Sequence, residues 1–298
     1  MIKIAVVGTG NVGRFAITNA LAEEDVELVG VITRKKHDLG IAGTENIQIA
    51  EDITALDVKP DVAVLCIPTR AVPETAEKCL NAGISTVDCF DIHGKIVDLR
   101  AQLDKAAKAN GRVAVTASGW DPGSDSIVRT LMQAAAPKGL TYTNFGPGMS
   151  MGHSVAAKSK PAVRDALSMT IPLGTGVHRR MVYIEVEQGS TYEEAKEQIL
   201  ADDYFCHDET HVIAVDDINQ LKDMGHGVHM IRKGVSGGTH NQILEFNMTI
   251  NNPALTAQMM IASARAATRQ NPGCYTLIEI PVVDYVQGER EDLVRKLV

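Results

Sequence analysis

MIKIAVVGTGNVG, residues 1–13, contains the strand, the glycine-rich turn and the helix start from which the fold is predicted. Ile2 to Val7 has the length and apolar character of a buried strand, and Asn11 to Ala22 has the spacing of apolar residues that is typical of a helix. The glycines between them form G-x-G-x-x-G. In this motif the first glycine permits a tight turn, the second lets a pyrophosphate approach the backbone, and the third lets helix and strand pack closely. The predicted dinucleotide-binding residues are Gly8, Gly10, Asn11, Val12 and Gly13.

The same alternation of strand and helix continues through the first third of the chain. Further strands are expected at 26–33, 62–67, 85–88 and 113–117, and further helices at 73–82 and 96–110. Strands that alternate with helices form a parallel sheet covered on both faces. A glycine triplet alone indicates no more than a tight turn, but inside a βαβ unit it indicates a nucleotide site. The predicted fold class is α/β, with an N-terminal Rossmann domain built on a doubly wound parallel sheet.

The residues after the second expected strand favour NADP over NAD. Folds that bind NAD usually carry an acidic residue there, which binds the ribose 2′-hydroxyl. This chain has Thr33-Arg34-Lys35-Lys36 instead. Arg34 could bind a 2′-phosphate with its planar guanidinium group, and Lys35 would add positive charge. The alternative is that these basic residues serve only to solvate an exposed strand end.

Polar residues gather at the carboxyl edge of the predicted sheet. Cys66, Pro68 and Thr69 follow one strand and are expected to line the cofactor pocket, although Thr69 could instead cap a helix. Asp91, in DCFDIH, follows the next strand, and Asp121, in SGWDPGSD, follows the one after that. Two carboxylates beside the nicotinamide could bind the ammonium group of a substrate. Asp121 could also do no more than cap the helix that follows it.

The composition of the sequence changes near Ser118, after which glycine and proline are frequent, as is typical of loops. We therefore expect a dinucleotide-binding domain over 1–118 and a second, α+β domain over 119–269. The tail, about 270–298, is expected to return to the first domain. A long apolar helix expected over 253–269 could be part of the core or of a dimer face.

Composition excludes several classes of protein. The 298 residues carry a formal net charge of -8, which disfavours nucleic acid as a partner because phosphate binding needs clustered Lys and Arg. No apolar run approaches the length of a membrane span, and the N-terminus lacks the form of a signal peptide, so a cytoplasmic protein is expected. The five cysteines are widely spaced and the histidines lack metal-ligand spacing, so we expect neither disulfides nor a metal.

Several separated motifs carry a family resemblance. They are DCFDIH (88–93), SGWDPGSD (118–125), NFGPGMSMGHS (144–154), SMTIP (168–172), GVHRR (176–180), GHGV (225–228), INNPALTAQ (250–258) and PGCYTLIEIPVVDY (272–285). Together they resemble meso-diaminopimelate dehydrogenase from end to end. Within that family the chain resembles the shorter branch with a relaxed substrate range, which also aminates 2-keto acids reductively to D-amino acids.

The resemblance implies a reaction and a set of roles. The reaction is the reversible NADP+-dependent oxidation of the D-centre of meso-2,6-diaminopimelate to L-2-amino-6-oxopimelate and ammonia, on the lysine and cell-wall branch of metabolism. Asp91 and Asp121 would hold the reacting amino group, with Trp120 as a wall of the pocket. The residues around the D-centre carboxylate would be Phe145, Met151 and Gly152, and those around the L-centre would be Thr170, Arg180, His226 and Asn252. The family also implies a homodimer, formed through the second domain.

Three questions stay open on the sequence. The proton acceptor could be Asp91, Asp121 or an ordered water. A dehydrogenase of similar architecture could act on a hydroxyl group rather than on an amine. A protein of another class, a non-catalytic NADP(H) sensor, would bind the cofactor and turn nothing over.

Overall fold

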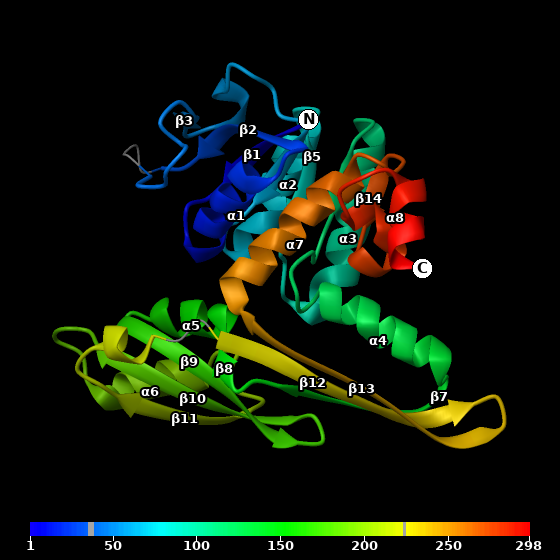
Figure 1. Cartoon of the computed structure of the whole chain (residues 1–298). Helices are drawn as coiled ribbons and strands as arrows, with labels where there is room; N and C mark the ends of the chain where they lie inside the picture. Colours follow the sequence, from blue (N-terminus) through cyan, green and yellow to red (C-terminus); the bar gives the residue numbers. More distant parts are fainter. Residues whose placement is uncertain (35–38, 223–224) are drawn as a thin grey trace. The chain divides into compact units, whose positions relative to one another are not determined.

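The computed structural model describes residues 1–34, 39–222 and 225–298 (Figure 1). The chain forms two compact units. Unit 1 consists of Met1–Ile127 and Pro253–Val298, and unit 2 consists of Val128–Asn252. Unit 2 is therefore inserted within the sequence of unit 1.

Unit 1 contains a seven-stranded parallel sheet in the order β14-β6-β5-β4-β1-β2-β3. Its strands are β1 (Ile2–Val7), β2 (Val26–Ile32), β3 (Gln48–Ala50), β4 (Val62–Leu65), β5 (Ser85–Asp88), β6 (Val113–Val115) and β14 (Gly273–Tyr275). The chain runs outward from β1 in one direction through β2 and β3, and in the other through β4, β5 and β6. The order reverses between β1 and β4, and dinucleotides bind at the carboxyl ends of strands at such a point.

Helices cover both faces of this sheet. They are α1 (Asn11–Ala22), α2 (Val72–Asn81), α3 (Ile96–Ala109) and α7 (Asn252–Ala267). Unit 1 also has α8 (Arg290–Leu297), which contacts the 3-10 turn at Val282–Tyr285, and further 3-10 turns at Thr69–Ala71, His93–Lys95 and Leu277–Glu279. Ile4 and Val6 pack into one core with α1 and α7, whereas Ala5 and Val7 pack into another with α2 and α3. Because neighbouring side chains on a strand point to opposite faces, a run of apolar residues produces two cores.

The structure corrects the expected domain limits. The expected boundary near Ser118 lies at Ile127, inside α4 (Ser124–Ala135), and the helix assigned to the second domain belongs to unit 1. The reason is burial: Met260 and Ile261 are fully buried in the core that contains β1. The apolar face of this helix is therefore core. The tail lies in unit 1, where β14 pairs with β6.

Unit 2 is an α+β unit with two sheets. One has the order β11-β10-β9-β8 and the other β13-β12-β7, and every pairing is antiparallel except that of β10 with β11. The strands are β7 (Lys138–Phe145), β8 (Gly148–Met149), β9 (Val163–Gly174), β10 (Val177–Val186), β11 (Glu209–Ala214), β12 (Gly225–Ser236) and β13 (Thr239–Asn251). The helices α5 (Met151–Lys158) and α6 (Tyr192–Leu200) pack with the first sheet around Val182 and Ile184.

Candidate active site

The turn after β1 has the geometry of a nucleotide cradle. Gly8 has a φ of +98°, and a Cβ there would lie 2.3 Å from the carbonyl oxygen of Cys66. A Cβ on Gly13 would lie 2.1 Å from the carbonyl oxygen of Gly8, whereas one on Gly10 would meet nothing within 4 Å. The outer two glycines are required by packing, and the middle one leaves space at the N-terminus of α1. Exposed amides and the helix dipole suit a pyrophosphate there, with Asn11 and Val12 in the first turn.

The end of β2 carries the residues expected at the 2′-phosphate. Arg34 is exposed, and Lys35 lies outside the described residues. Two contacts that the sequence did not predict lie near this strand end, one to the glycine turn and one from α1 to Leu39. The hydroxyl oxygens of Thr9 and Thr33 lie 3.2 Å apart, and Nη1 of Arg14 donates to the carbonyl of Leu39 at 2.7 Å.

The strand end at β4 is joined directly to that at β5. The Thr69 hydroxyl donates to Oδ1 of Asp91 at 2.6 Å and accepts from the Asp91 amide at 3.2 Å. The hydroxyl expected to line the cofactor pocket thus holds a predicted amine-binding carboxylate. Pro68 precedes the 3-10 turn that begins at Thr69. Burial raises the pKa of the Cys66 thiol, which therefore stays protonated and unreactive.

A buried carboxylate that the sequence did not single out joins β5 to β6. Oδ1 of Asp88 accepts hydrogen bonds from the Phe90 amide at 3.0 Å, from the Ala117 amide at 3.2 Å and from the Thr116 hydroxyl at 2.9 Å. The amide and hydroxyl of Ser118 both donate to the Asp88 carbonyl at 2.8 Å. Burial raises the pKa of Asp88 to about 6. These bonds fix the two segments that lead to Asp91 and Asp121.

The segment after β6 is a tight loop that precedes α4. A Cβ on Gly123 would lie 1.8 Å from the carbonyl oxygen of Gly119, so the loop closes backbone against backbone. Trp120 is buried at 5% exposure, and its carbonyl accepts from the Asp125 amide at 3.0 Å. Asp121 lies in this loop and Asp125 in the first turn of α4.

In unit 2, the two-residue strand β8 gathers the residues predicted to bind the L-centre. Gly148 pairs with Thr170 on β9. A Cβ on Gly148 would lie 2.5 Å from the Cα of His226, so β8 and β12 are in close contact. The side-chain amide of Asn252 donates to the Met149 carbonyl at 2.9 Å. Residues from three distant parts of the sequence therefore surround one short strand.

Arg180 joins this group through its side chain. It lies opposite Thr170 in the β9–β10 register, and its Nη1 donates to the Thr170 hydroxyl at 2.5 Å. Its Nε donates to Oδ2 of Asp208 at 2.7 Å. The side chain of Arg180 is 14% exposed and that of Asp208 is 33% exposed. A fixed guanidinium group of this kind can bind a carboxylate.

Two histidines near Arg180 stay neutral. Burial and the charge of Arg180 lower the pKa of His153 to about 3, and the same two causes lower the pKa of His178. Nε2 of His178 accepts a hydrogen bond from the Phe145 amide at 2.8 Å, and Nδ1 of His153 lies 2.8 Å from the Ser150 hydroxyl. Neither histidine was predicted to act in the site. Both support segments that were: Phe145 ends β7, and Met151 and Gly152 open α5 directly after Ser150.

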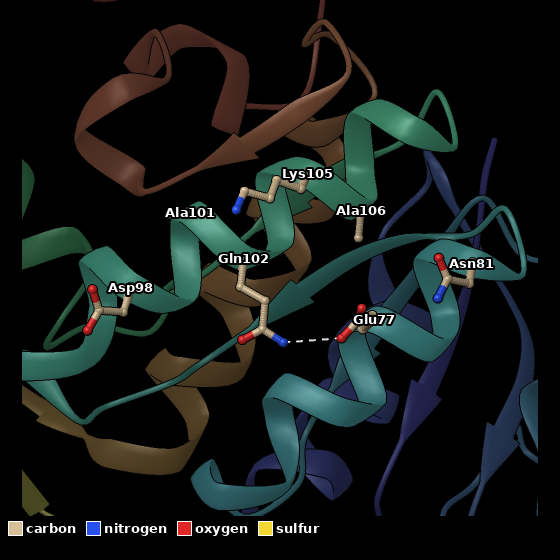
Figure 2. Close-up of a pocket in the computed structure, with 7 residues that line it drawn as sticks. All are labelled: Glu77, Asn81, Asp98, Ala101, Gln102, Lys105 and Ala106. Carbon is tan, nitrogen blue, oxygen red and sulfur yellow. Dashed lines mark hydrogen bonds between the residues drawn. The ribbon is translucent and has the colours of Figure 1, made fainter.

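A shallow surface groove between α2 and α3 lies elsewhere on unit 1 (Figure 2). Gln102 donates to Glu77 across it at 3.1 Å, and Lys105 and Asp98 lie along its α3 side. None of the predicted site residues lines this groove. Within the described ranges, no cluster of three or more His, Cys, Asp or Glu side chains could hold a metal ion, and no helix is long and apolar enough to cross a membrane.

Comparison with known proteins gives matches over the whole chain. Residues 2–89 match the model of the oxidoreductase family with an NAD-binding Rossmann fold, and residues 119–177 match the diaminopimelic acid dehydrogenase C-terminal domain. The chain is 54% identical over 297 residues to a meso-diaminopimelate D-dehydrogenase of Bacteroides fragilis, covering 100% of this chain and 99% of that protein. It is 33% identical to the enzyme of that name from Lysinibacillus sphaericus, with 94% of each chain covered.

Two solved structures agree with this chain over its length. One is C. glutamicum DAP dehydrogenase in complex with DAP, at 30% identity and a TM-score of 0.88. The other is an engineered D-amino acid dehydrogenase bound to NADP+, at 29% identity and a TM-score of 0.88. Each match covers 100% of this chain and 99% of the other.

Proposed function

Because this chain belongs to the meso-diaminopimelate dehydrogenase family, we propose that it converts the D-centre of meso-2,6-diaminopimelate reversibly to the 6-oxo group of L-2-amino-6-oxopimelate, with release of ammonia. The comparisons confirm the predicted family, the Rossmann fold with a second α+β unit, and an NADP-dependent oxidoreductase. The preference between meso-diaminopimelate and simple 2-keto acids with ammonia belongs to the proposal.

Unit 1 supplies the groups for the cofactor and the reacting amine. When bound, NADP+ supplies the oxidising chemistry by accepting a hydride from the D-centre carbon. Gly8, Gly10 and Gly13 would hold its pyrophosphate, and Arg34 its 2′-phosphate. In the proposal, Asp91 and Asp121 hold the amino group. The Thr69 hydroxyl keeps Asp91 in place, because its hydrogen bond to the carboxylate limits the rotamers of Asp91.

Unit 2 supplies the groups for the rest of the substrate. Arg180 and Thr170 are proposed to bind the L-centre with His226 and Asn252. Anchoring this far end orients the D-centre hydrogen and rejects the mirror-image arrangement, so stereochemical choice comes from geometry rather than from pocket size. Phe145, Met151 and Gly152 would surround the D-centre carboxylate, and Trp120 would form a wall beside the reacting amine.

One observation carries the proposal. A buried Thr, His and Asn lie around the two residues of β8, and a half-buried Arg bonds to that Thr, in a chain that also has the glycine cradle and the Thr69–Asp91 pair. A substrate with an amino acid at each end needs two such charge-complementary sets of residues.

The test follows NADPH absorbance with meso-, LL- and DD-diaminopimelate and with D-alanine, each with NAD+ and NADP+. Turnover of the meso isomer with NADP+ is expected, with release of one ammonia for each NADPH formed. Broad turnover of D-amino acids would indicate the relaxed branch. A second assay follows NADPH oxidation with a 2-keto acid, with and without ammonia. Oxidation that needs no ammonia would indicate a hydroxyl dehydrogenase, and cofactor binding without any turnover would indicate a sensor.

The proposal includes a homodimer in the cytoplasm. Leu140 on β7 and Ile243 on β13 are 63% and 56% exposed, so the three-stranded sheet of unit 2 offers apolar side chains to a second copy. Light scattering coupled to size-exclusion chromatography should give twice the mass of 32.0 kDa. A charged substitution, Ile243→Lys, should shift that mass toward the monomer.

A further inference from the structure

The acidic partner of Arg180 has no role in the proposed function. Starting from that function, we propose that Asp208 is a positioning residue for substrate choice. It fixes the Arg180 guanidinium so that tight binding requires a substrate with a second carboxylate. Asp208 does not touch the substrate in this proposal; it acts through Arg180.

The geometry of Arg180 supports this role. A guanidinium group has five N–H donors in a rigid plane. Here Nε donates to Asp208 and Nη1 to Thr170, so two different acceptors fix both the position and the rotation of the plane. Nη2 makes no hydrogen bond to the residues that the structure describes, so its two N–H groups and the second one on Nη1 are left for a carboxylate. Fixing the group beforehand reduces the entropy lost when the substrate binds.

Both acceptors are themselves held. Thr170 is 1% exposed and lies opposite Arg180 in the β9–β10 register. Asp208 lies immediately before β11, where the Thr210 hydroxyl contacts the carbonyls of Asp208 and Phe205 at 3.2 Å each. Thr210 is in turn opposite Arg180 in the β10–β11 register. The arginine is therefore held between two neighbouring strands of one sheet.

Arg180 is positively charged, whereas the two neighbouring histidines are neutral. The pKa values of His153 and His178 are lowered by burial and by Arg180 itself, so both rings are neutral at neutral pH. Asp208 offsets part of the arginine charge. If charge alone decided affinity, removing Asp208 would strengthen the binding of a carboxylate. If orientation decides it, removing Asp208 weakens binding, and the sign of the effect separates the two.

The chain offers a matched control one residue away from each member of the Arg180–Asp208 pair. Arg179 and Glu209 form the same kind of pair, with Nε and Oε1 2.7 Å apart. Because side chains alternate along a strand, this pair lies on the opposite face of the sheet. Both of its members are well exposed, at 39% and 46%.

The experiment compares Asp208→Ala, Asp208→Asn and Glu209→Ala with the wild type. The KM and kcat for meso-diaminopimelate, the KM for NADP+ and the melting temperature are measured, with calorimetric binding of meso-diaminopimelate to the NADPH complex as a second readout. For Asp208→Ala we expect the KM and Kd for the substrate to rise about 10- to 30-fold, because a hydrogen bond between charged groups is lost. The kcat should change less than about threefold, and the KM for NADP+ should not change. Asp208→Asn keeps an oxygen acceptor and should recover most of the affinity, while Glu209→Ala should match the wild type.

Several outcomes would overturn the proposal. Unchanged or tighter substrate binding by Asp208→Ala would show that orientation by Asp208 is not needed. An equal loss of affinity for NADP+ would show a general structural role. If the alanine variant does not fold, Asp208→Asn is the deciding variant. Its KM for meso-diaminopimelate should rise about threefold, and an unchanged KM would contradict the positioning role. A wild-type enzyme that is inactive on meso-diaminopimelate would refute the proposed function as well, whereas an active one with insensitive Asp208 variants would refute the positioning role alone.

Discussion

Units 1 and 2 assemble their predicted residues in different ways. In unit 1 each group lies in a short motif at the end of its own strand, and the parallel order of β1, β4, β5 and β6 brings those ends to one edge. In unit 2 the residues around β8 come from positions as far apart as 148 and 252 and meet through strand register and close backbone contact. The cofactor site should therefore tolerate changes that leave its motifs intact, while the L-centre group should depend on β8.

The largest expected effect follows from a change in β8 itself. A methyl group on Gly148 would meet rigid backbone, 2.3 Å from the Gly225 carbonyl oxygen, so Gly148→Ala must displace β8 from β12. We expect the affinity for meso-diaminopimelate to fall about 100-fold or more and the unfolding free energy to fall by about 2–3 kcal/mol, as overpacking does. Binding of NADP+, measured by fluorescence, should not change. Gly238→Ala is the control, since a Cβ there meets nothing within 4 Å. Equal losses of both ligands would show that the units are not independent.

The next effect concerns Asp88 and pH. Its pKa is raised from 3.8 to about 6 by burial, so the folded protein binds this proton more tightly than the unfolded chain does. This contribution to stability is present below pH 4 and is lost as the pH rises through 6. Over the whole titration the free energy of unfolding falls by about 3 kcal/mol, and roughly half of this loss occurs between pH 5 and 7.5. Asp88→Asn removes this titrating group. Urea unfolding should therefore show that the wild type loses stability relative to the variant between pH 5 and 7.5.

A surface carboxylate gives the control of opposite sign. The Lys78 ammonium lowers the pKa of Asp52 to about 2, so the contribution of Asp52 is lost as the pH falls, not as it rises. Between pH 5 and 7.5, the free energy of unfolding of Asp52→Asn should therefore change with pH as it does in the wild type. If the difference in unfolding free energy between Asp88→Asn and the wild type does not change with pH, the raised pKa of Asp88 is contradicted.

Cofactor choice gives a smaller effect, confined to unit 1. Arg34→Glu would place a carboxylate where a 2′-phosphate is expected, and the KM for NADP+ should rise about 10- to 50-fold, the cost of a lost charged contact. The KM for NAD+ should stay the same or fall. Arg295→Glu, an exposed charge reversal on α8, should alter neither KM. An NADP+ affinity that survives Arg34→Glu would remove the 2′-phosphate role from this residue.

The smallest effect tests the link between β4 and β5. Thr69→Val removes the hydroxyl that holds Asp91, and we expect kcat/KM for meso-diaminopimelate to fall about 5- to 10-fold, the value of one hydrogen bond to a charged group. The KM for NADP+ should change less than twofold. A rise in the KM for NADP+ with an intact kcat would return Thr69 to the cofactor role first expected for it. Thr54→Val, which removes a similar bond to the exposed Asp52, is the control.

The same contrast explains how much of the fold was predictable. The helix expected at 11–22 has those limits in the structure, and the strand at 85–88 likewise, because each repeats an apolar pattern within a few residues. In unit 2 the strands β7, β9 and β12 were not predicted. The residues of β7 are exposed or half-buried, so their sequence carries no clear period. The two residues of β8 are too few for any pattern.

For the candidate site, local signals predicted the cofactor residues and the two aspartates of unit 1. Only the family resemblance predicted Trp120 and the candidate residues of unit 2. Arg180 lies in a basic run, and nothing in that run predicts its bonds to Thr170 and Asp208. Asp88 was overlooked although it opens the DCFDIH motif, because a carboxylate at a strand end is expected to be solvated rather than buried. His178 supports Phe145 from 33 positions away, a distance at which the sequence alone gives no sign of contact.

The insertion of unit 2 within unit 1 has a consequence for biosynthesis. The core under β1 needs Met260 and Ile261 from α7, and the sheet needs β14 beside β6. A ribosome releases these segments only after the whole of unit 2 has been made. Unit 2 is continuous in sequence and can therefore fold before unit 1 is complete. Until α7 and β14 have been made, the apolar strands of the incomplete sheet stay exposed, and a chaperone can bind them during that interval.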